Sequence, residues 1–208
     1  MCTETFLRLP EEKRNRFLNA AWDEFTCTAF ADASINQIVR RAGVPRGSFY
    51  QYFAGKEDLF AYLGEIILKH LVAEYRKILT QAEGDLFKAQ LLCFDRVAAY
   101  GSAADVLFDR SIRILQKNPG ILPQTAAKER VLHRLFTEVG EELDVSCLRS
   151  DAPAFAEQAF ALTLIALAMA VVSCLETPEN AGHIRETLVM QLEIIRQGSL
   201  ADPGREAV

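Results

Sequence analysis

The sequence predicts an all-α protein in two parts, an N-terminal three-helix domain that contains a helix-turn-helix and a C-terminal helical bundle. Apolar residues recur at helical spacing along most of the 208 residues, and no alternating strand pattern competes with them. Glycine and proline residues interrupt this spacing and separate the helices. We expect residues 1–55 to form the first domain, residues 56–198 the second, and residues 199–208 a disordered tail.

The first helix should begin at Pro10, after a loose arm formed by residues 1–9. Two acidic residues follow Pro10, where the helix dipole favours negative charge. Apolar residues then recur at helical spacing, at Leu18, Ala21, Trp22 and Phe25. This apolar side is expected to pack against the helix-turn-helix that follows.

The helix-turn-helix occupies residues 34–56, with the sequence SINQIVRRAGVPRGSFYQYFAGK. Ser34 and Gln37 have the spacing of a capping box, which predicts that a helix starts at Ser34. Gly43 suits the left-handed position that ends such a helix, and Pro45 suits the first position of the next one. Two short helices joined by a tight turn are therefore expected.

The second helix of this motif should present polar and basic side chains outward, because Phe49 and Phe53, four residues apart, anchor its inner side. Arg46 can donate two hydrogen bonds to guanine, and Gln51 can bond adenine in the same way. Hydroxyl and ammonium groups beside them can hold phosphates. The alternative is a helical hairpin with a solvated basic edge. The residues expected to contact double-stranded DNA are Ser34, Gln37, Arg46, Gly47, Ser48, Tyr50, Gln51, Tyr52 and Lys56.

Residues 42–44 (AGV), 47–50 (GSFY), 52–53 (YF) and 56–59 (KEDL) closely resemble the DNA-binding domain of the tetracycline-repressor (TetR) family, and the resemblance covers roughly residues 10–60. One departure is Ala29, where many members have glycine, so the first helix is expected to end in another geometry. The resemblance implies a homodimeric regulator, most often a repressor that a small-molecule effector releases from a palindromic operator.

Charge and cysteine content narrow the classes of protein further. The net charge of −5 argues against a protein that coats nucleic acid non-specifically. No secretory signal is visible, and no cysteine pair has metal-ligand spacing, so we expect a cytoplasmic protein with free thiols and without metal or cofactor. The nucleotide-binding, serine-hydrolase and zinc-protease motifs of enzymes are also missing. The five cysteines are Cys2, Cys27, Cys93, Cys147 and Cys174.

A long helix from Lys56 to about Glu83 should connect the two domains, and five more helices should follow near residues 85–100, 103–116, 124–143, 153–175 and 179–197. Residues 159–175 carry no charge, but this single run of 17 residues lacks a basic flank, and we do not expect it to span a membrane. The resemblance implies that the last two helices pair with their copies. The expected dimer contacts are Ala159, Thr163, Ala166, Ala170, Ser173, Ile184, Leu188, Leu192 and Ile195.

A ligand pocket is expected inside the helical bundle, although core packing explains buried aromatic residues equally well. A body that senses a protein partner is the other alternative, and a dry, fully packed interior would favour it. The candidate pocket residues are aromatic walls with basic or imidazole anchors, at His70, Phe87, Phe94, Tyr100, Phe108, Arg110, Arg113 and Phe136.

Overall fold

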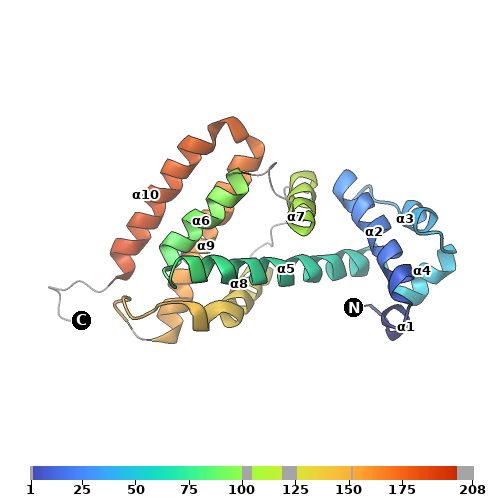
Figure 1. The fold of residues 1–208 in the computed structure, drawn as a ribbon, viewed down its shortest axis with the longest axis horizontal. Helices are drawn as coiled ribbons and strands as arrows, with labels where there is room; N and C mark the ends of the chain where they lie inside the picture. The colour runs from blue at the N-terminus through green and yellow to red at the C-terminus, as the bar shows by residue number, and fades with distance from the viewer. Residues whose placement is uncertain (1, 100–104, 119–125, 151, 201–208) are drawn as a thin grey trace. The chain divides into compact units, whose positions relative to one another are not determined.

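The computed structural model describes residues 2–99, 105–118, 126–150 and 152–200 (Figure 1). No strand occurs among them, and an isolated bridge joins Leu148 to Leu200. The all-α prediction is confirmed. The helices are α1 (Glu4–Leu7), α2 (Glu11–Cys27), α3 (Ile35–Ala42), α4 (Arg46–Tyr52), α5 (Lys56–Gln81), α6 (Leu86–Ala98), α7 (Val106–Lys117), α8 (Ala126–Val139), α9 (Pro153–Glu176) and α10 (Ala181–Ser199), with 3-10 turns η1 (Gly140–Glu142) and η2 (Pro178–Asn180).

The chain divides into two compact units, which differ from a simple split along the sequence. The N-terminal unit holds residues 1–71 together with residues 105–121, and the C-terminal unit holds residues 72–104 and 122–208. Helix α7 therefore belongs to the N-terminal unit, where the Asn118 side chain accepts a hydrogen bond from the Phe30 amide at 2.8 Å. The predicted functional boundary between residues 55 and 56 stays a prediction.

Aromatic rings form the core of the N-terminal unit. Helix α2 packs on α3 and α7, while α1 and α3 pack on α4. Phe17 stacks on Phe53 at 5.9 Å between ring centroids, and Phe49 lies 6.2 Å from each of these two rings. All three side chains are fully buried. Large apolar rings contribute most of the stabilisation of a small domain, so this cluster is what holds the helix-turn-helix together.

The N-terminal segment is helical and packed, so the expectation of a loose arm is wrong. The Thr3 amide donates to the Tyr52 carbonyl at 3.0 Å, and the Thr3 hydroxyl donates to the Gln51 carbonyl at 2.6 Å. Phe6 is fully buried and contacts the rings of Phe17, Tyr52, Phe53 and Tyr62. Helix α1 thereby supplies partners for the carbonyl groups left unpaired at the end of α4.

Helix α9 is the centre of the C-terminal unit and packs against α6, α8 and α10. It is long and apolar enough to cross a membrane by length and composition, and 39% of its most apolar stretch is buried inside the structure. A helix in the core of a protein can have the same length and apolar composition. Arg185 on α10 donates two hydrogen bonds to Asp95 on α6, which adds a bidentate ion pair to this packing.

A glycine at the end of α5 permits a close approach of two backbone segments. Gly84 has φ of +79°, and a Cβ atom added there would lie 2.9 Å from the amide nitrogen of Asp144. That amide donates to the Gly84 carbonyl at 3.0 Å. Any larger residue would have to push the two segments apart, so residue 84 must be glycine for this turn.

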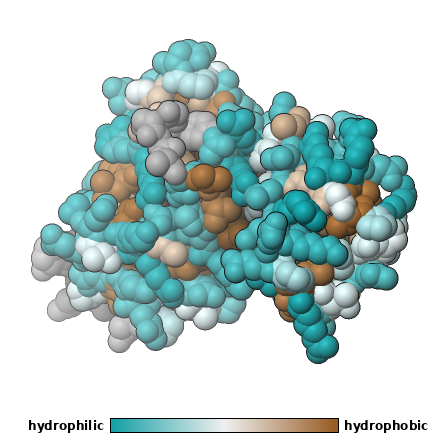
Figure 2. All heavy atoms as spheres, turned by 45° about the vertical axis from the view of Figure 1, so that its right-hand side comes forward, coloured by the Kyte–Doolittle hydropathy of each residue, from teal (hydrophilic) through white to brown (hydrophobic). Residues whose placement is uncertain are grey.

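Hydrophilic side chains cover most of the face shown in Figure 2, and apolar side chains reach it in separate patches. Across the described residues, the large apolar side chains that are exposed include several on α9 and α10. These are Leu162, Met169, Val189, Met190 and Ile194.

Candidate nucleic-acid interface

Helix α3 starts where the sequence predicts, but a residue of another helix caps it. Ser34 is the N-cap residue and makes no side-chain capping bond. The Glu24 carboxylate of α2 instead accepts a hydrogen bond from the Ser34 amide at 2.8 Å, and its other oxygen lies 3.3 Å from Arg41. The predicted reciprocal capping box is therefore wrong, and Gln37 bonds Arg40. A buried carboxylate contacts both the first and the last turn of α3.

The turn between α3 and α4 has the expected left-handed glycine. Gly43 has φ of +65°, and the Val44 amide donates to the Val39 carbonyl at 3.0 Å, the long bond of a Schellman motif. Pro45 is the N-cap of α4 and not its first helical residue, and its carbonyl accepts from the Ser48 amide at 2.9 Å. The turn predicted from Gly43 and Pro45 is confirmed to within one residue.

Helix α2 ends without a left-handed residue, as expected from Ala29, which stands where many members of the resembled family have glycine. The helix ends at Cys27, and Thr28 takes an extended conformation with φ of −126°. The Thr28 amide and the Thr28 hydroxyl both donate to the Glu24 carbonyl, at 3.0 and 2.7 Å. The expected absence of a left-handed cap is confirmed.

The inner side of α4 holds one residue that the sequence analysis placed outside. Tyr52 is only 4% exposed, and its ring lies 5.6 Å from the rings of Phe6 and Phe17. Since Tyr52 follows Phe49 by three positions, the two share a face of the helix. The expectation that Tyr52 points outward is wrong.

The outer side of α4 presents Arg46, Gly47, Tyr50 and Gln51, all exposed, with Ser48 half-buried beside them. The Arg46 guanidinium donates to the Asn36 side chain of α3 and to the Tyr50 hydroxyl, at 3.4 Å for the second bond. These partners orient the guanidinium at the surface and leave other N–H groups available to a base. The role of Asn36 was not predicted, because no sequence pattern indicates that the side chains of Asn36 and Arg46 are in contact.

Lys56 has internal partners. Its ammonium donates to the carbonyls of Ala31 and Ala33 at 3.0 and 3.2 Å and lies 4.8 Å from the centre of the Phe30 ring. It therefore ties the start of α5 to the loop before α3. An ammonium has three donors, so one proton is left for a phosphate, and that contact stays a prediction.

Replacing Glu24 by leucine should lower the free energy of unfolding by about 1–3 kcal/mol, because the Ser34 amide and Arg41 would lose their common partner. Glu24→Gln keeps an acceptor for the amide and should lose less. Urea denaturation measures both. Asp23→Leu, at the exposed neighbouring position, is the control. An equal loss for Asp23→Leu and Glu24→Leu would contradict the capping role.

The predicted pocket residues are distributed over both units. Arg110 in the N-terminal unit donates to Asn19 at 3.1 Å and lies 5.3 Å from the centre of the Trp22 ring, and Arg113 donates to Asp109. Phe108 is buried in the same unit. In the C-terminal unit, Phe87 and Phe94 are buried and Phe136 is half-buried, while Tyr100 lies outside the described residues. The expectation that these residues line one ligand pocket stays a prediction.

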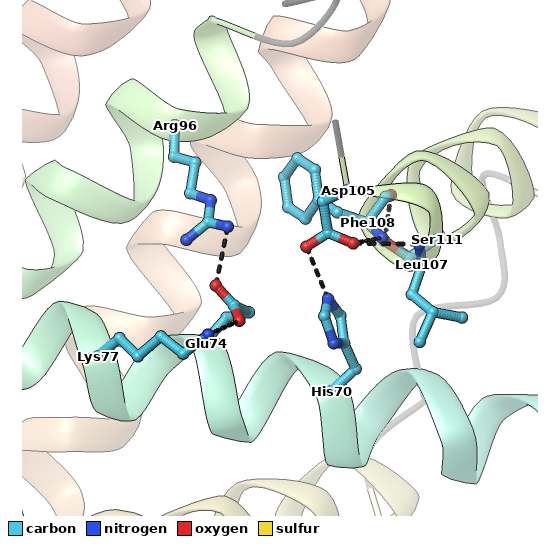
Figure 3. Close-up of polar contacts among 8 residues, drawn as sticks. All are labelled: His70, Glu74, Lys77, Arg96, Asp105, Leu107, Phe108 and Ser111. Carbon is cyan, nitrogen blue, oxygen red and sulfur yellow. Dashed lines mark hydrogen bonds and ion pairs between the residues drawn. The ribbon is translucent and has the colours of Figure 1, made fainter. Parts of the chain in front are cut away.

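His70, another predicted pocket residue, bonds the carboxylate that caps α7. Its Nε2 lies 2.7 Å from Asp105, whose other oxygen accepts from the amides of Leu107 and Phe108 (Figure 3). Burial opposes the charge of Asp105, but the hydrogen bonds of Phe108, His70 and Leu107 hold the pKa of this carboxyl below its usual range. The pair therefore fixes the start of α7 on α5.

One pocket of about 200 Å³ lies within the C-terminal unit. Among the predicted residues that the structure describes, Phe87 lines it, with Arg196 5.8 Å from the centre of its ring. The start of α6, the segment after η1, Ala156 of α9 and the end of α10 form the other walls. The sequence did not indicate this pocket, because its walls come from segments about 60 and 110 residues apart.

Five of the predicted dimer residues lie buried in the chain's own core, so the expectation that they face a partner is wrong. Ala166, Ser173, Ile184 and Ile195 are half-buried, and their place in an interface stays a prediction. Since α9 is apolar all round, its sequence does not show which side faces outward. The buried residues are Ala159, Thr163, Ala170, Leu188 and Leu192.

The profile of the family described as bacterial regulatory proteins, tetR family, matches residues 17–63. The chain is 48% identical over 52 residues to the uncharacterized HTH-type transcriptional regulator YdgC of Bacillus subtilis, covering 25% of this chain and 27% of YdgC. It is 32% identical over 106 residues to the HTH-type transcriptional regulator HbdR of Aromatoleum sp., covering 50% and 44%. The chain thus spans less than half the length of these curated relatives.

Three solved structures, of two proteins, resemble this chain in fold over at least 91% of its length. A transcriptional regulator from Rhodococcus sp. Rha1 superposes with a TM-score of 0.63 at 19% identity, covering 91% of this chain and 98% of that one. SmeT, the repressor of a Stenotrophomonas maltophilia multidrug efflux pump, gives 0.57 at 16% identity, with 98% of both chains covered. SmeT in complex with triclosan gives 0.59 at the same identity, covering 95% and 99%. At these identities the likeness is one of fold.

Proposed function

Because the chain belongs, by its N-terminal domain, to the TetR family of bacterial regulatory proteins, we propose that it is a homodimeric repressor that binds a palindromic operator. A small molecule bound in the C-terminal unit releases it from DNA. A transcriptional regulator of this family acts by binding DNA, and no catalytic activity is part of the proposal.

The outer side of α4 carries this proposal. Arg46, Tyr50 and Gln51 are exposed on one short helix, whose opposite side is locked by the fully buried rings of Phe49 and Phe53. A recognition helix needs this combination, because its base contacts are specific only when the scaffold holds them rigidly. Positive charge is concentrated at the helix-turn-helix: residues 34–56 hold Arg40, Arg41, Arg46 and Lys56 and no acidic residue, whereas Lys and Arg balance Asp and Glu in residues 1–60, eight against eight.

Arg46→Ala should relax base preference by about 1–3 kcal/mol, or roughly five- to 150-fold in the ratio of operator to random-DNA affinity. The reason is the loss of the guanidinium that Asn36 and Tyr50 orient. Fluorescence anisotropy with both DNAs at one stated salt concentration measures the ratio. Lys88→Ala on α6, which removes an exposed positive charge from the C-terminal unit, is the control. Equal losses on operator and random DNA would exclude Arg46 as a base reader.

Dimerisation would place two recognition helices on one operator. Symmetric dimers of this kind read half-sites about 34–36 Å apart, which is why their operators are palindromic. The exposed apolar side chains of α9 and α10 support a homodimer. Met190 and Ile194 stand four residues apart on one side of α10, and Leu162 and Met169 stand seven apart on one side of α9.

A small-molecule effector is supported by the SmeT–triclosan complex, in which a protein of similar fold binds a small molecule. Helical bundles provide such sites between their helices. The C-terminal unit of the present chain also contains buried polar side chains, among them Gln90 and Thr163.

The first experiment is a mobility shift of the full-length protein with DNA fragments from beside its own gene, with random competitor at stated salt. A specific footprint centred on a palindrome is the expected result. A folded dimer that shows no preference for any of these fragments, even after extensive dialysis to remove bound effector, would contradict the proposal.

A further inference from the structure

The core of the C-terminal unit contains an amide oxygen that no described residue serves. Gln90 on α6 is completely buried. Its Nε2 donates to the Tyr75 hydroxyl and to the Thr163 hydroxyl, both at 3.1 Å, whereas its Oε1 accepts no hydrogen bond. A buried polar atom without a partner costs about 1–3 kcal/mol, so such atoms are rare in folded proteins and call for a missing partner.

The orientation of this amide follows from its neighbours. The Thr163 hydroxyl donates its proton to the Phe160 carbonyl at 2.9 Å, so toward Gln90 it can only accept. The amide atom that faces Thr163 must therefore be the nitrogen, and the oxygen must point elsewhere. The Tyr75 hydroxyl likewise accepts from Gln90 and keeps its own proton, for which the described residues provide no acceptor.

We propose that Gln90 and Tyr75 form the polar end of an effector site that binds an uncharged, largely apolar molecule with a hydroxyl group. A hydroxyl can donate to the Gln90 oxygen and accept from Tyr75, and thus supplies both missing partners at once. This inference rests on the proposed function, because it names the class of molecule that would release the repressor.

The apolar part of such a molecule has aromatic neighbours. The Phe160 ring lies 6.1 Å from that of Tyr75 and 5.7 Å from that of Phe136, and Phe94 stands one turn after Gln90 on α6, fully buried. Binding sites for small molecules combine such rings with a few convergent polar groups.

The described groups around Gln90 do not favour a charged molecule. Burial raises the pKa of Tyr75 far above its ordinary value and that of Cys93 to about 12, so both groups are neutral. The adjacent Glu74 carboxylate is engaged, since Lys77 and Arg96 donate to it at 2.5 and 2.8 Å (Figure 3). An ion bound at Gln90 would lose its hydration without an opposite charge, which strongly disfavours it.

The test compares hydroxyl compounds with their methyl ethers, because an ether keeps the acceptor and the shape but cannot donate. Phenol, para-propylphenol and beta-naphthol, each beside its ether, are titrated calorimetrically into the full-length protein without DNA. At least one hydroxyl compound should bind about tenfold or more tightly than its ether. In Gln90→Leu this ratio should fall to about one, whereas Gln116→Leu, an exposed glutamine of α7, should preserve it.

Two results would overturn the inference. One is a ratio near one for all three pairs in the wild type, which would mean that water serves the Gln90 oxygen. The other is a ratio that Gln90→Leu leaves unchanged. A melting curve checks that Gln90→Leu is folded. The substitution removes the unpaired oxygen but also the donor to the Tyr75 hydroxyl, so the affinity ratio and not the melting temperature is the readout.

A parallel operator-release assay keeps this inference separate from the proposed function. Hydroxyl binding that depends on Gln90 but leaves the DNA complex intact would preserve the site and contradict ligand-induced release. Release by a compound whose affinity does not change in Gln90→Leu would support the repressor function and contradict the proposed site at Gln90.

Discussion

Met169→Glu should turn the protein into a monomer that binds its operator at least about a hundredfold more weakly than the wild type. Met169 is 62% exposed on α9, among the apolar side chains that support the homodimer. In a two-fold symmetric interface each subunit would bury one new carboxylate without a partner, at about 3–5 kcal/mol for each charge. A monomer has one recognition helix and loses the second half-site. Sedimentation measures the oligomeric state, and a mobility shift measures the affinity.

The control for Met169→Glu is Val106→Glu, which adds the same charge at a residue that is 60% exposed in the N-terminal unit. It should remain dimeric and bind the operator. A Met169→Glu protein that stays dimeric at nanomolar concentrations would place the dimer contact elsewhere on the surface.

Phe6→Ala should lower the free energy of unfolding of the N-terminal unit by about 3–5 kcal/mol, the usual range for a buried phenylalanine. The expected effect is large because Phe6 contacts four other rings and holds α1 against the end of α4. Losing α1 would also remove the Thr3 hydrogen bonds to α4. Urea denaturation followed by circular dichroism measures the loss, and operator affinity should fall with it.

Leu7→Ala is the matched control for Phe6→Ala, since Leu7 is the next residue and is 51% exposed. It should change the unfolding free energy by less than about 0.5 kcal/mol. Similar losses for the two variants would mean that α1 is frayed in solution and does not support α4.

The helices were predictable because long periodic segments with clear breaks carry their own signal. The segment Lys56–Gln81 and the Gly43 turn appear in the structure almost where the sequence places them. Helix α1 was missed because four residues give no periodicity, and its stability comes from rings distant in sequence. Local pattern therefore predicts the elements but not the short helix that completes the core.

The side chains of the site were harder to place, since contacts between elements decide them. Glu24 takes the capping role that the spacing assigned to Gln37, from ten residues upstream of Ser34. Tyr52 has an aromatic ring and a hydroxyl, so its residue type suits both the core and a DNA contact. Its side chain is buried because it lies three positions after Phe49, on the same side of α4. Helix α9 is apolar on every side, so its sequence does not show which of its side chains are buried within one subunit.

The position of Trp22 gives the protein a built-in optical reporter. It is the single tryptophan of the chain, buried in α2 with the Arg110 guanidinium over its ring. Its fluorescence therefore reports on the N-terminal unit alone. A change in emission when a compound binds in the C-terminal unit would reveal a signal passing along the chain, before any DNA is added and without an attached dye.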